Sequence, residues 1–281
     1  MKVVLFCGGL GLRLRDHSER IPKPMVPIGY RPILWHIMKY YAHFGHRDFT
    51  LCLGYKADVV KQYFLDYNEA LSNDFVLSGN GNGGDRSHVE LLGSDIHDWR
   101  ITFADTGLHA NIGQRLLAVR EHLQDEELFL ASYSDCVCDA PLPRLIEDFK
   151  GREKIGAFLS VPPVVPGHFI AQSENGLVRS ITSPRDSGLW VNGGYFIFRP
   201  ELFDHFRDGD ELVVEPFQRL IAKRQLITYP YEGFWAPMDT LRDRQNLESL
   251  FERGRAPWAI WEKPGADELV LDLTRSQRVM T

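Results

Sequence analysis

A glycine-rich stretch near the N-terminus precedes two cationic side chains. Its three glycines fall within four positions and follow the apolar residues 2–6: Gly8, Gly9 and Gly11. Glycines after a buried strand bring bare backbone N–H groups close to a phosphate, and Arg13 and Lys23 add positive charge nearby. The pattern predicts a loop that binds the phosphates of a nucleoside triphosphate. A tight strand-to-helix turn with two surface cations is the alternative, because a lone glycine motif has low specificity.

Two carboxylates follow segments that could place them beside such a loop. Asp135 comes just after the apolar run 128–132, and Asp239 follows the aromatic segment 233–238, which we expect to be a loop. Mg²⁺ prefers oxygen ligands and keeps several waters, so two carboxylates can hold it. We therefore expect a magnesium site at Asp135 and Asp239. The alternative is structural: a helix N-cap or turn at Asp135, and an N-cap for a helix beginning near Leu241 at Asp239.

These groups together match the needs of nucleotidyl transfer. Backbone donors must hold the triphosphate, a cation must lie near the leaving pyrophosphate, and a metal must neutralise the α-phosphate. An attacking phosphate is already an anion, so the site needs positioning and charge more than a strong base. The joint occurrence of the groups carries the hypothesis, since each alone has a structural explanation.

Alternating apolar patterns predict the elements that position these residues. Strands are expected at 2–6, 48–53, 99–104, 128–132 and 155–161, with helices at 32–44, 57–71, 113–122 and 143–149 between them. This alternation favours an α/β fold with a mostly parallel sheet flanked by helices. Right-handed crossovers then place the loops after the strands at one sheet edge.

The pattern changes from Pro162 onward, where short strands with an Asn175–Gly176 hairpin turn suggest a small sheet-rich lobe. We expect one domain over residues 1–254, with this lobe at roughly 162–235, and a C-terminal tail at 255–281. The glycine-rich segment 79–85 is long for a connection, and is expected to be functional, mobile or a hairpin tip.

Composition narrows the class of protein. The 281 residues carry a net charge of −6 without a basic patch, which argues against nucleic-acid binding. No apolar run of 18 residues or signal peptide is evident, so no membrane association is expected. Four cysteines without zinc spacing indicate reduced thiols and a cytoplasmic protein.

The sequence resembles the sugar-1-phosphate nucleotidyltransferases, and within them a cytidylyltransferase branch, over most of residues 1–250. The start signature is present as Gly8-Gly9-Leu10-Gly11-Leu12-Arg13-Leu14 followed by Lys23-Pro24-Met25. Further matches are 32–38 (PILWHIM), 54–56 (GYK), 105–107 (DTG), 190–194 (WVNGG) and 233–243 (GFWAPMDTLRD).

The resemblance implies a Rossmann-like fold, Mg²⁺ as cofactor, and the reaction of CTP with glucose 1-phosphate to give CDP-glucose and pyrophosphate. It assigns the metal to Asp135 and Asp239, and phosphate handling to Arg13 and Lys23. It places base and ribose contacts near Gly8, Gly9, Gly107 and Arg115, and sugar contacts at Asn192 and Gly193. It also implies a homo-oligomer, a trimer or hexamer.

Three departures from the family pattern stand out. Leu12 replaces the signature threonine, and Ser134 and Cys136 flank Asp135 where the family has glycines. The family's Glu-Lys-Pro before the WVNGG motif is absent; this chain has Thr182-Ser183-Pro184-Arg185. Arginine can bind phosphate through two hydrogen bonds, so we expect Arg185 to replace the acceptor-binding lysine of the family.

Two alternatives to the implied reaction follow from these departures. One is the same chemistry on a different phosphorylated acceptor, and the other is a nucleotide-binding regulatory subunit without catalysis. A dinucleotide-dependent oxidoreductase is disfavoured, since no Gly-x-Gly-x-x-Gly is present: position 14 is leucine.

Overall fold

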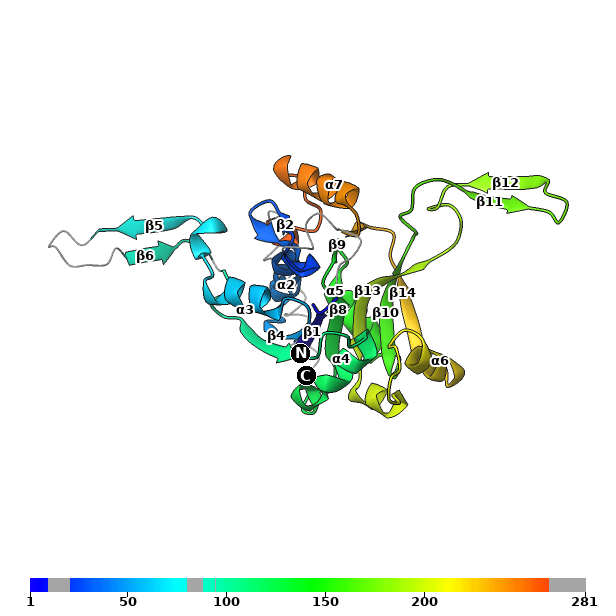
Figure 1. Ribbon diagram of the computed structural model, residues 1–281, viewed down its shortest axis with the longest axis horizontal. Helices are drawn as coiled ribbons and strands as arrows, with labels where there is room; N and C mark the ends of the chain where they lie inside the picture. Colours follow the sequence, from blue (N-terminus) through cyan, green and yellow to red (C-terminus); the bar gives the residue numbers. More distant parts are fainter. Residues whose placement is uncertain (10–20, 80–87, 94, 263–281) are drawn as a thin grey trace.

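A seven-stranded sheet forms the centre of the molecule in the computed structural model, which describes residues 1–9, 21–79, 88–93 and 95–262 (Figure 1). Its strands, in spatial order, are β14 (Leu226–Pro230), β10 (Gly156–Val161), β13 (Val191–Phe198), β8 (Phe129–Tyr133), β1 (Lys2–Phe6), β4 (Asp48–Leu53) and β7 (Arg100–Asp105). All neighbouring pairs are parallel except the two that β13 makes with β8 and β10. The predicted mostly parallel α/β sheet is therefore confirmed.

Apolar side chains cover both faces of the sheet. Along β1, Val3 and Leu5 face one core cluster, while Val4 and Phe6 face the other. This two-residue alternation is what a strand buried on both faces requires. The first cluster includes residues of helices α2 (Ile33–His43), α5 (Leu142–Lys150) and α7 (Leu241–Glu252), and the second includes residues of α4 (Ile112–Ala118) and α6 (Glu215–Ala222).

The helices and small sheets have the following bounds. The α-helices are α2 (Ile33–His43), α3 (Ala57–Leu65), α4 (Ile112–Ala118), α5 (Leu142–Lys150), α6 (Glu215–Ala222) and α7 (Leu241–Glu252). The 3₁₀ helices are η2 (Lys23–Met25), η3 (Glu69–Leu71), η4 (Arg120–Leu123), η5 (Pro200–His205) and η6 (Ile260–Glu262). The two-stranded sheets pair β2 (Pro27–Ile28) with β3 (Arg31–Pro32), β5 (Phe75–Ser78) with β6 (His88–Leu91), β9 (Cys136–Cys138) with β15 (Trp235–Pro237), and β11 (Phe169–Gln172) with β12 (Val178–Thr182).

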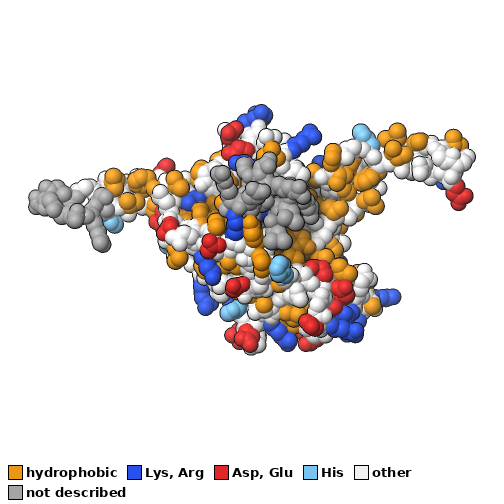
Figure 2. Space-filling view, in the orientation of Figure 1, with side chains coloured by type: hydrophobic (Ala, Val, Ile, Leu, Met, Phe, Trp, Pro, Cys, Tyr) orange, Lys and Arg blue, Asp and Glu red, His pale blue; other side chains and the backbone are white. Residues whose placement is uncertain are grey.

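Two hairpins extend from opposite sides of the body in Figure 1. The β11–β12 hairpin turns at Asn175–Gly176 as predicted, and Gly176 has the positive φ of 80° that favours glycine in such a turn. Strands β5 and β6 pair antiparallel on either side of the glycine-rich segment 79–85, whose residues 80–85 lie outside the described part. Both hairpins expose apolar side chains, which are visible along the two arms in Figure 2.

Three predicted elements differ from the structure. The helix expected over 113–122 is observed as α4, which ends at Ala118, followed by the separate 3₁₀ helix η4. The helix expected over 57–71 ends at Leu65, and a separate 3₁₀ turn follows at Glu69–Leu71, where the Asn68 side chain accepts a hydrogen bond from the Ala70 N–H. The segment 233–238, expected as a loop, contains strand β15, which pairs with β9. Both three-residue strands are too short for their alternation to be recognised in the sequence.

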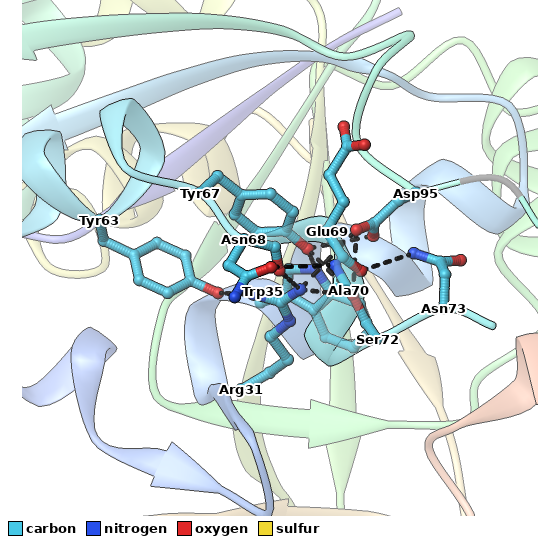
Figure 3. A network of polar contacts seen from close by, with 10 residues as sticks. All are labelled: Arg31, Trp35, Tyr63, Tyr67, Asn68, Glu69, Ala70, Ser72, Asn73 and Asp95. Atoms are coloured by element: carbon cyan, nitrogen blue, oxygen red, sulfur yellow. Dashed lines mark hydrogen bonds and ion pairs between the residues drawn. The ribbon is translucent and has the colours of Figure 1, made fainter. Parts of the chain in front are cut away.

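A buried polar network anchors the base of the β5–β6 hairpin (Figure 3). Arg31 is 1% exposed and stacks on the ring of Tyr67 at 4.1 Å, while its Nη2 donates to the Asn68 carbonyl at 2.6 Å. Asp95 accepts hydrogen bonds from the Tyr67 and Ser72 hydroxyls, both at 3.0 Å. Arg31 therefore ties β3 to the residues on both sides of the hairpin.

All four cysteines are buried and free, in agreement with the expected thiols. In the part of the chain that the structure describes, no helix is long and apolar enough to cross a membrane. The division between a domain at 1–254 and a tail at 255–281 stays a prediction. Within that tail, Trp258 is 1% exposed and its ring stacks on Phe234 at 5.7 Å.

His36 joins Trp258 to the body of the protein through its neutral imidazole. Its Nε2 lies 3.0 Å from the Ile28 carbonyl, and its Nδ1 accepts from the Trp258 indole N–H at 3.3 Å. These partners require a proton on Nε2 and none on Nδ1. Burial lowers the pKa of His36 to about 4, because a charged imidazole would lose its hydration there.

This lowered pKa predicts a loss of stability in mild acid. Between pH 6.5 and 4 the unfolded chain binds a proton at His36 and the folded protein does not, so the free energy of unfolding falls by about 3 kcal/mol. Between pH 6.5 and pH 4, the free energy of unfolding should fall by about 3 kcal/mol less in His36→Gln than in the wild type. Urea unfolding at both pH values measures this difference. Burial also lowers the pKa of His46 to about 4. His46→Gln is therefore measured in the same way, so that the contributions of the two histidines to the pH dependence can be told apart. Equal pH dependence in wild type and His36→Gln would contradict the prediction.

Candidate active site

Lys23 lies between the two predicted metal-binding carboxylates. Its Nζ donates to Asp135 Oδ2 at 2.7 Å and to Asp239 Oδ1 at 2.5 Å. The Lys23 side chain is 13% exposed, against 33% for Asp135 and 35% for Asp239. Burial alone would lower the pKa of the Lys23 ammonium, but attraction and hydrogen bonds from the two carboxylates outweigh it and raise the pKa. The ammonium therefore stays charged at neutral pH.

Strand pairing brings the two carboxylates together from distant parts of the sequence. Strand β8 leads to the turn at Ser134–Asp135, and β9 then pairs antiparallel with β15 so that Cys136 faces Pro237. The Met238 N–H continues the ladder by donating to the Asp135 carbonyl at 2.8 Å. Asp239 follows directly, so the register of this short ladder sets the separation of the two carboxylates.

The N-cap interpretation of Asp239 is wrong, because α7 is capped by the next residue. The Thr240 hydroxyl accepts from the Asp243 N–H, and the Asp243 carboxylate accepts from the Thr240 N–H at 2.8 Å, which together form a capping box. Asp135 lies in the turn before β9 and not at a helix N-terminus. The turn alternative for Asp135 therefore agrees with the structure, and both carboxylates in addition accept hydrogen bonds from the Lys23 ammonium.

The carboxylate pair offers oxygen ligands of the kind that Mg²⁺ prefers. Two hard anionic oxygens from separate strands converge on one cation, and each side chain is one-third exposed, which leaves room for water ligands. Among the described residues, no group of three or more His, Cys, Asp or Glu side chains could hold a metal. Asp135 and Asp239 therefore fit the expected Mg²⁺.

Arg115 joins the loops that follow three adjacent parallel strands. It is 2% exposed, and its guanidinium donates to Gly8 O after β1 at 2.9 Å and to Leu53 O at the end of β4 at 3.0 Å. After β7 it donates to Thr106 Oγ1 at 2.7 Å and to Gly107 O at 2.9 Å. A Cβ on Gly8 would lie 2.1 Å from Arg115 Nη1, so only glycine permits this approach.

Arg115 therefore shapes the loops where nucleotide contacts were expected. Gly107 has a φ of 92°, and its N–H donates to the Asp105 carboxylate at 3.1 Å, which fixes the turn after β7. Gly9 is exposed beside Gly8. Direct contacts of Gly8, Gly9, Gly107 and Arg115 with a nucleotide stay predictions. Gly11 and Arg13, with Leu12, lie outside the described residues.

The predicted acceptor residues occupy separate positions. Asn192 accepts from the Gly194 N–H at 2.9 Å at the start of β13, and the Gly193 carbonyl accepts from the Trp235 indole at 2.8 Å. Strand β13 is thereby linked to β15, which leads to Asp239. Arg185 follows β12 and donates to the Glu232 carbonyl at 2.8 Å. Their contacts with an acceptor stay predictions.

The sequence analysis did not predict the roles of two residues that support the site, Ser134 and Asp139. The Ser134 hydroxyl donates to the Phe6 carbonyl at 2.6 Å and so joins β8 to β1 beside the site. Asp139 accepts from the Tyr231 hydroxyl and from the Phe234 N–H, which holds the segment before β15. Ser134 could have been found in the sequence, because it replaces a family glycine next to Asp135. No sequence motif indicated a role for Asp139.

Comparisons with known proteins identify the family and the fold of the chain. The family model described as nucleotidyl transferase matches residues 2–213. The chain is 39% identical over 266 residues to the glucose-1-phosphate cytidylyltransferase of Salmonella typhi, which covers 93% of this chain and 100% of that protein. It is 32% identical over 263 residues to a probable glucose-1-phosphate cytidylyltransferase of Bacillus subtilis, with the same coverage. A putative glucose-1-phosphate thymidylyltransferase from Bacillus anthracis, solved with sucrose, has a similar fold: the TM-score is 0.63 at 16% identity, over 89% of this chain and 94% of that one.

The Arg115 contacts predict a large loss of stability on substitution. Arg115→Met leaves the carbonyls of Gly8, Leu53 and Gly107 without this donor, at a cost of about 2–4 kcal/mol in the free energy of unfolding. Arg115→Lys should recover only part of it, because an ammonium cannot reproduce the planar fork. Chemical denaturation measures both, with exposed Arg144→Met on α5 as the matched control. A change as small as that of the control would contradict the role of Arg115.

Proposed function

This chain belongs to the nucleotidyl transferase family, and we propose that it transfers a cytidylyl group from CTP to a sugar 1-phosphate, releasing pyrophosphate. The convergence of Lys23, Asp135 and Asp239 on one point carries the proposal, because it supplies both a metal site and a phosphate-binding cation. The name of the Salmonella typhi relative supports CTP as donor and glucose 1-phosphate as the default acceptor.

The proposed reaction is a single displacement at phosphorus. An oxygen of the acceptor phosphate forms a bond to the α-phosphorus of CTP, and the bond from that phosphorus to the bridging oxygen breaks, so that pyrophosphate leaves. Asp135 and Asp239 would hold Mg²⁺, which when bound would neutralise negative charge on the phosphates. The acceptor phosphate is already ionised, so no side chain needs to remove a proton from it.

The protein's own residues hold the reactants in place for this displacement. We assign Gly8, Gly9 and Gly11 to the triphosphate as backbone donors, and Arg13 and Lys23 to the charge on the leaving pyrophosphate. Gly107 and Arg115 belong to the base and ribose side, where Arg115 supports the Gly8 and Gly107 loops by the contacts described above. These assignments rest on the motif positions and on the loop geometry around Arg115.

A second candidate is the same transfer to a phosphorylated acceptor other than glucose 1-phosphate. The segment 182–185 contains no lysine or acidic residue, and Arg185 supplies its only cation. Ser183 and Asp186 are engaged with each other, since the Ser183 hydroxyl donates to the Asp186 carboxylate at 2.5 Å. Arg185, Asn192 and Gly193 are therefore the proposed acceptor contacts.

We also propose that the protein forms a homo-oligomer, a trimer or hexamer. Isolated two-stranded hairpins are marginally stable in water, yet the two hairpins expose large apolar side chains on both strands. On β5–β6 these are Phe75, Val76, Leu77 and Val89, and on β11–β12 they are Phe169, Ile170, Val178 and Ile181. Burial of such surfaces against another copy would stabilise both hairpins.

Pyrophosphate release tests the proposed function. CTP should give faster release than ATP, GTP or UTP with glucose 1-phosphate or with another sugar 1-phosphate, in the presence of Mg²⁺. Asp135→Asn and Asp239→Asn should each lower kcat by about 10²-fold or more, because each weakens the metal site. The exposed Asp125→Asn is the matched control. Absence of release with every nucleotide and acceptor would overturn the proposal.

Arg185 predicts a selective effect on the acceptor. Arg185→Ala should raise KM for the sugar 1-phosphate by about tenfold, since a charge-assisted contact to phosphate is lost, and leave KM for CTP unchanged. Steady-state kinetics with each substrate varied in turn make this measurement. The exposed Arg179→Ala on β12 serves as the control. If both variants have the acceptor KM of the wild type, Arg185 does not bind the acceptor.

A further inference from the structure

We infer that Lys23 occupies the cation position between Asp135 and Asp239 in the nucleotide-free protein, and yields it to the metal when the metal binds together with the triphosphate. The inference rests on the proposed function and concerns how its metal site is controlled. Metal entry and the movement of Lys23 toward phosphate would then be one coupled event.

The geometry makes the two cations compete for the same two oxygens. Lys23 Nζ lies 2.7 Å from Asp135 Oδ2 and 2.5 Å from Asp239 Oδ1. A Mg²⁺ ion bound by the same two oxygens would lie about 2.0–2.1 Å from each. An ion that bridges the two oxygens from the side that the ammonium occupies would overlap it, and the like charges would repel. The metal can take this position only after the ammonium has moved.

The ammonium also has a structural task while no metal is bound. Two carboxylates that converge on one point repel each other, and Lys23 offsets this repulsion with a hydrogen bond to each. The pair is therefore kept in a binding-competent arrangement. The same contacts lower the affinity for a metal, because the metal must compete with an existing cation.

Only the side chain of Lys23 needs to move. Its backbone opens η2, whose Pro24 and Met25 are buried, and its carbonyl accepts from the Val26 N–H at 3.1 Å. The lysine stem is long and flexible, so the ammonium can swing while the backbone stays in place. A triphosphate bound beside it supplies the negative charge that the ammonium loses when it leaves the carboxylates.

This exchange predicts coupling between metal and nucleotide. The metal alone should bind weakly, and CTP should raise its affinity because the phosphates receive the displaced ammonium. Coupling of binding free energies is reciprocal, so the metal should raise the affinity for CTP by the same factor. Without the ammonium, the metal alone should bind more tightly, and most of the coupling between metal binding and CTP binding should disappear.

Direct binding of Mn²⁺, followed by electron paramagnetic resonance of the free ion, tests the exchange. Without nucleotide, Lys23→Met should bind Mn²⁺ about tenfold or more tightly than the wild type, because the competing cation is removed. The exposed Lys150→Met on α5 should match the wild type. Lys23→Gln is the second variant, and circular dichroism checks the fold of both. In the wild type, saturating Mn²⁺ should raise the affinity of the protein for CTP. After correction for the Mn²⁺–CTP association measured in buffer, the increase should be about tenfold.

The outcomes separate the inference from the proposed function. Mn²⁺ affinity that is unchanged in Lys23→Met and Lys23→Gln, in a protein whose wild type turns over CTP, would overturn the exchange and leave the function standing. Independent binding of Mn²⁺ and CTP to the wild type would overturn it as well, even if neither variant folds. If the wild type neither binds Mn²⁺ with CTP present nor releases pyrophosphate, both the exchange and the function are wrong.

Discussion

The close approach of two carboxylates to one ammonium is the constraint on which the site depends. Asp135 and Asp239 are separated by about a hundred residues of chain, and a three-residue strand pair, β9 with β15, brings them together. The ladder continues through the Met238 N–H and the Asp135 carbonyl, so a shift of register would displace Asp239 relative to its partner. Strand β8, buried at the centre of the sheet, gives this pair a rigid base.

Support for the pair extends beyond the residues that contact Lys23. Trp235 of β15 donates to the Gly193 carbonyl on β13, which connects the β9–β15 pair to the main sheet. Phe234 stacks on Trp258, whose indole is held by His36 on α2. A chain of packed groups thus runs from the C-terminal segment through the aromatic motif to Asp239. The aromatic residues of that motif act as structural supports for the carboxylate that follows them.

Much of the sheet was predictable from local pattern. Strands β1 and β4 have the expected bounds, because continuous apolar runs bounded by glycine or charge are distinctive in a doubly covered sheet. The site was predictable only through the joint occurrence of Lys23, Asp135 and Asp239 and the family resemblance. The β9–β15 pairing was not, since pairing between three-residue strands depends on distant parts of the chain. The capping box of Thr240 and Asp243 was readable in the sequence as Thr-x-x-Asp, and it would have removed the N-cap interpretation of Asp239.

The guanidinium of Arg115 has a consequence for attempts to exchange loops between members of this family. One side chain bonds to the ends of three successive parallel strands, at Gly8, Leu53 and Gly107, so these loops form a single mechanical unit. Grafting one loop from a homologous enzyme would leave the other two shaped for the original partner. Loop exchange between members of this family should therefore be most successful when all three loops are transplanted as a set together with the helix that carries the arginine.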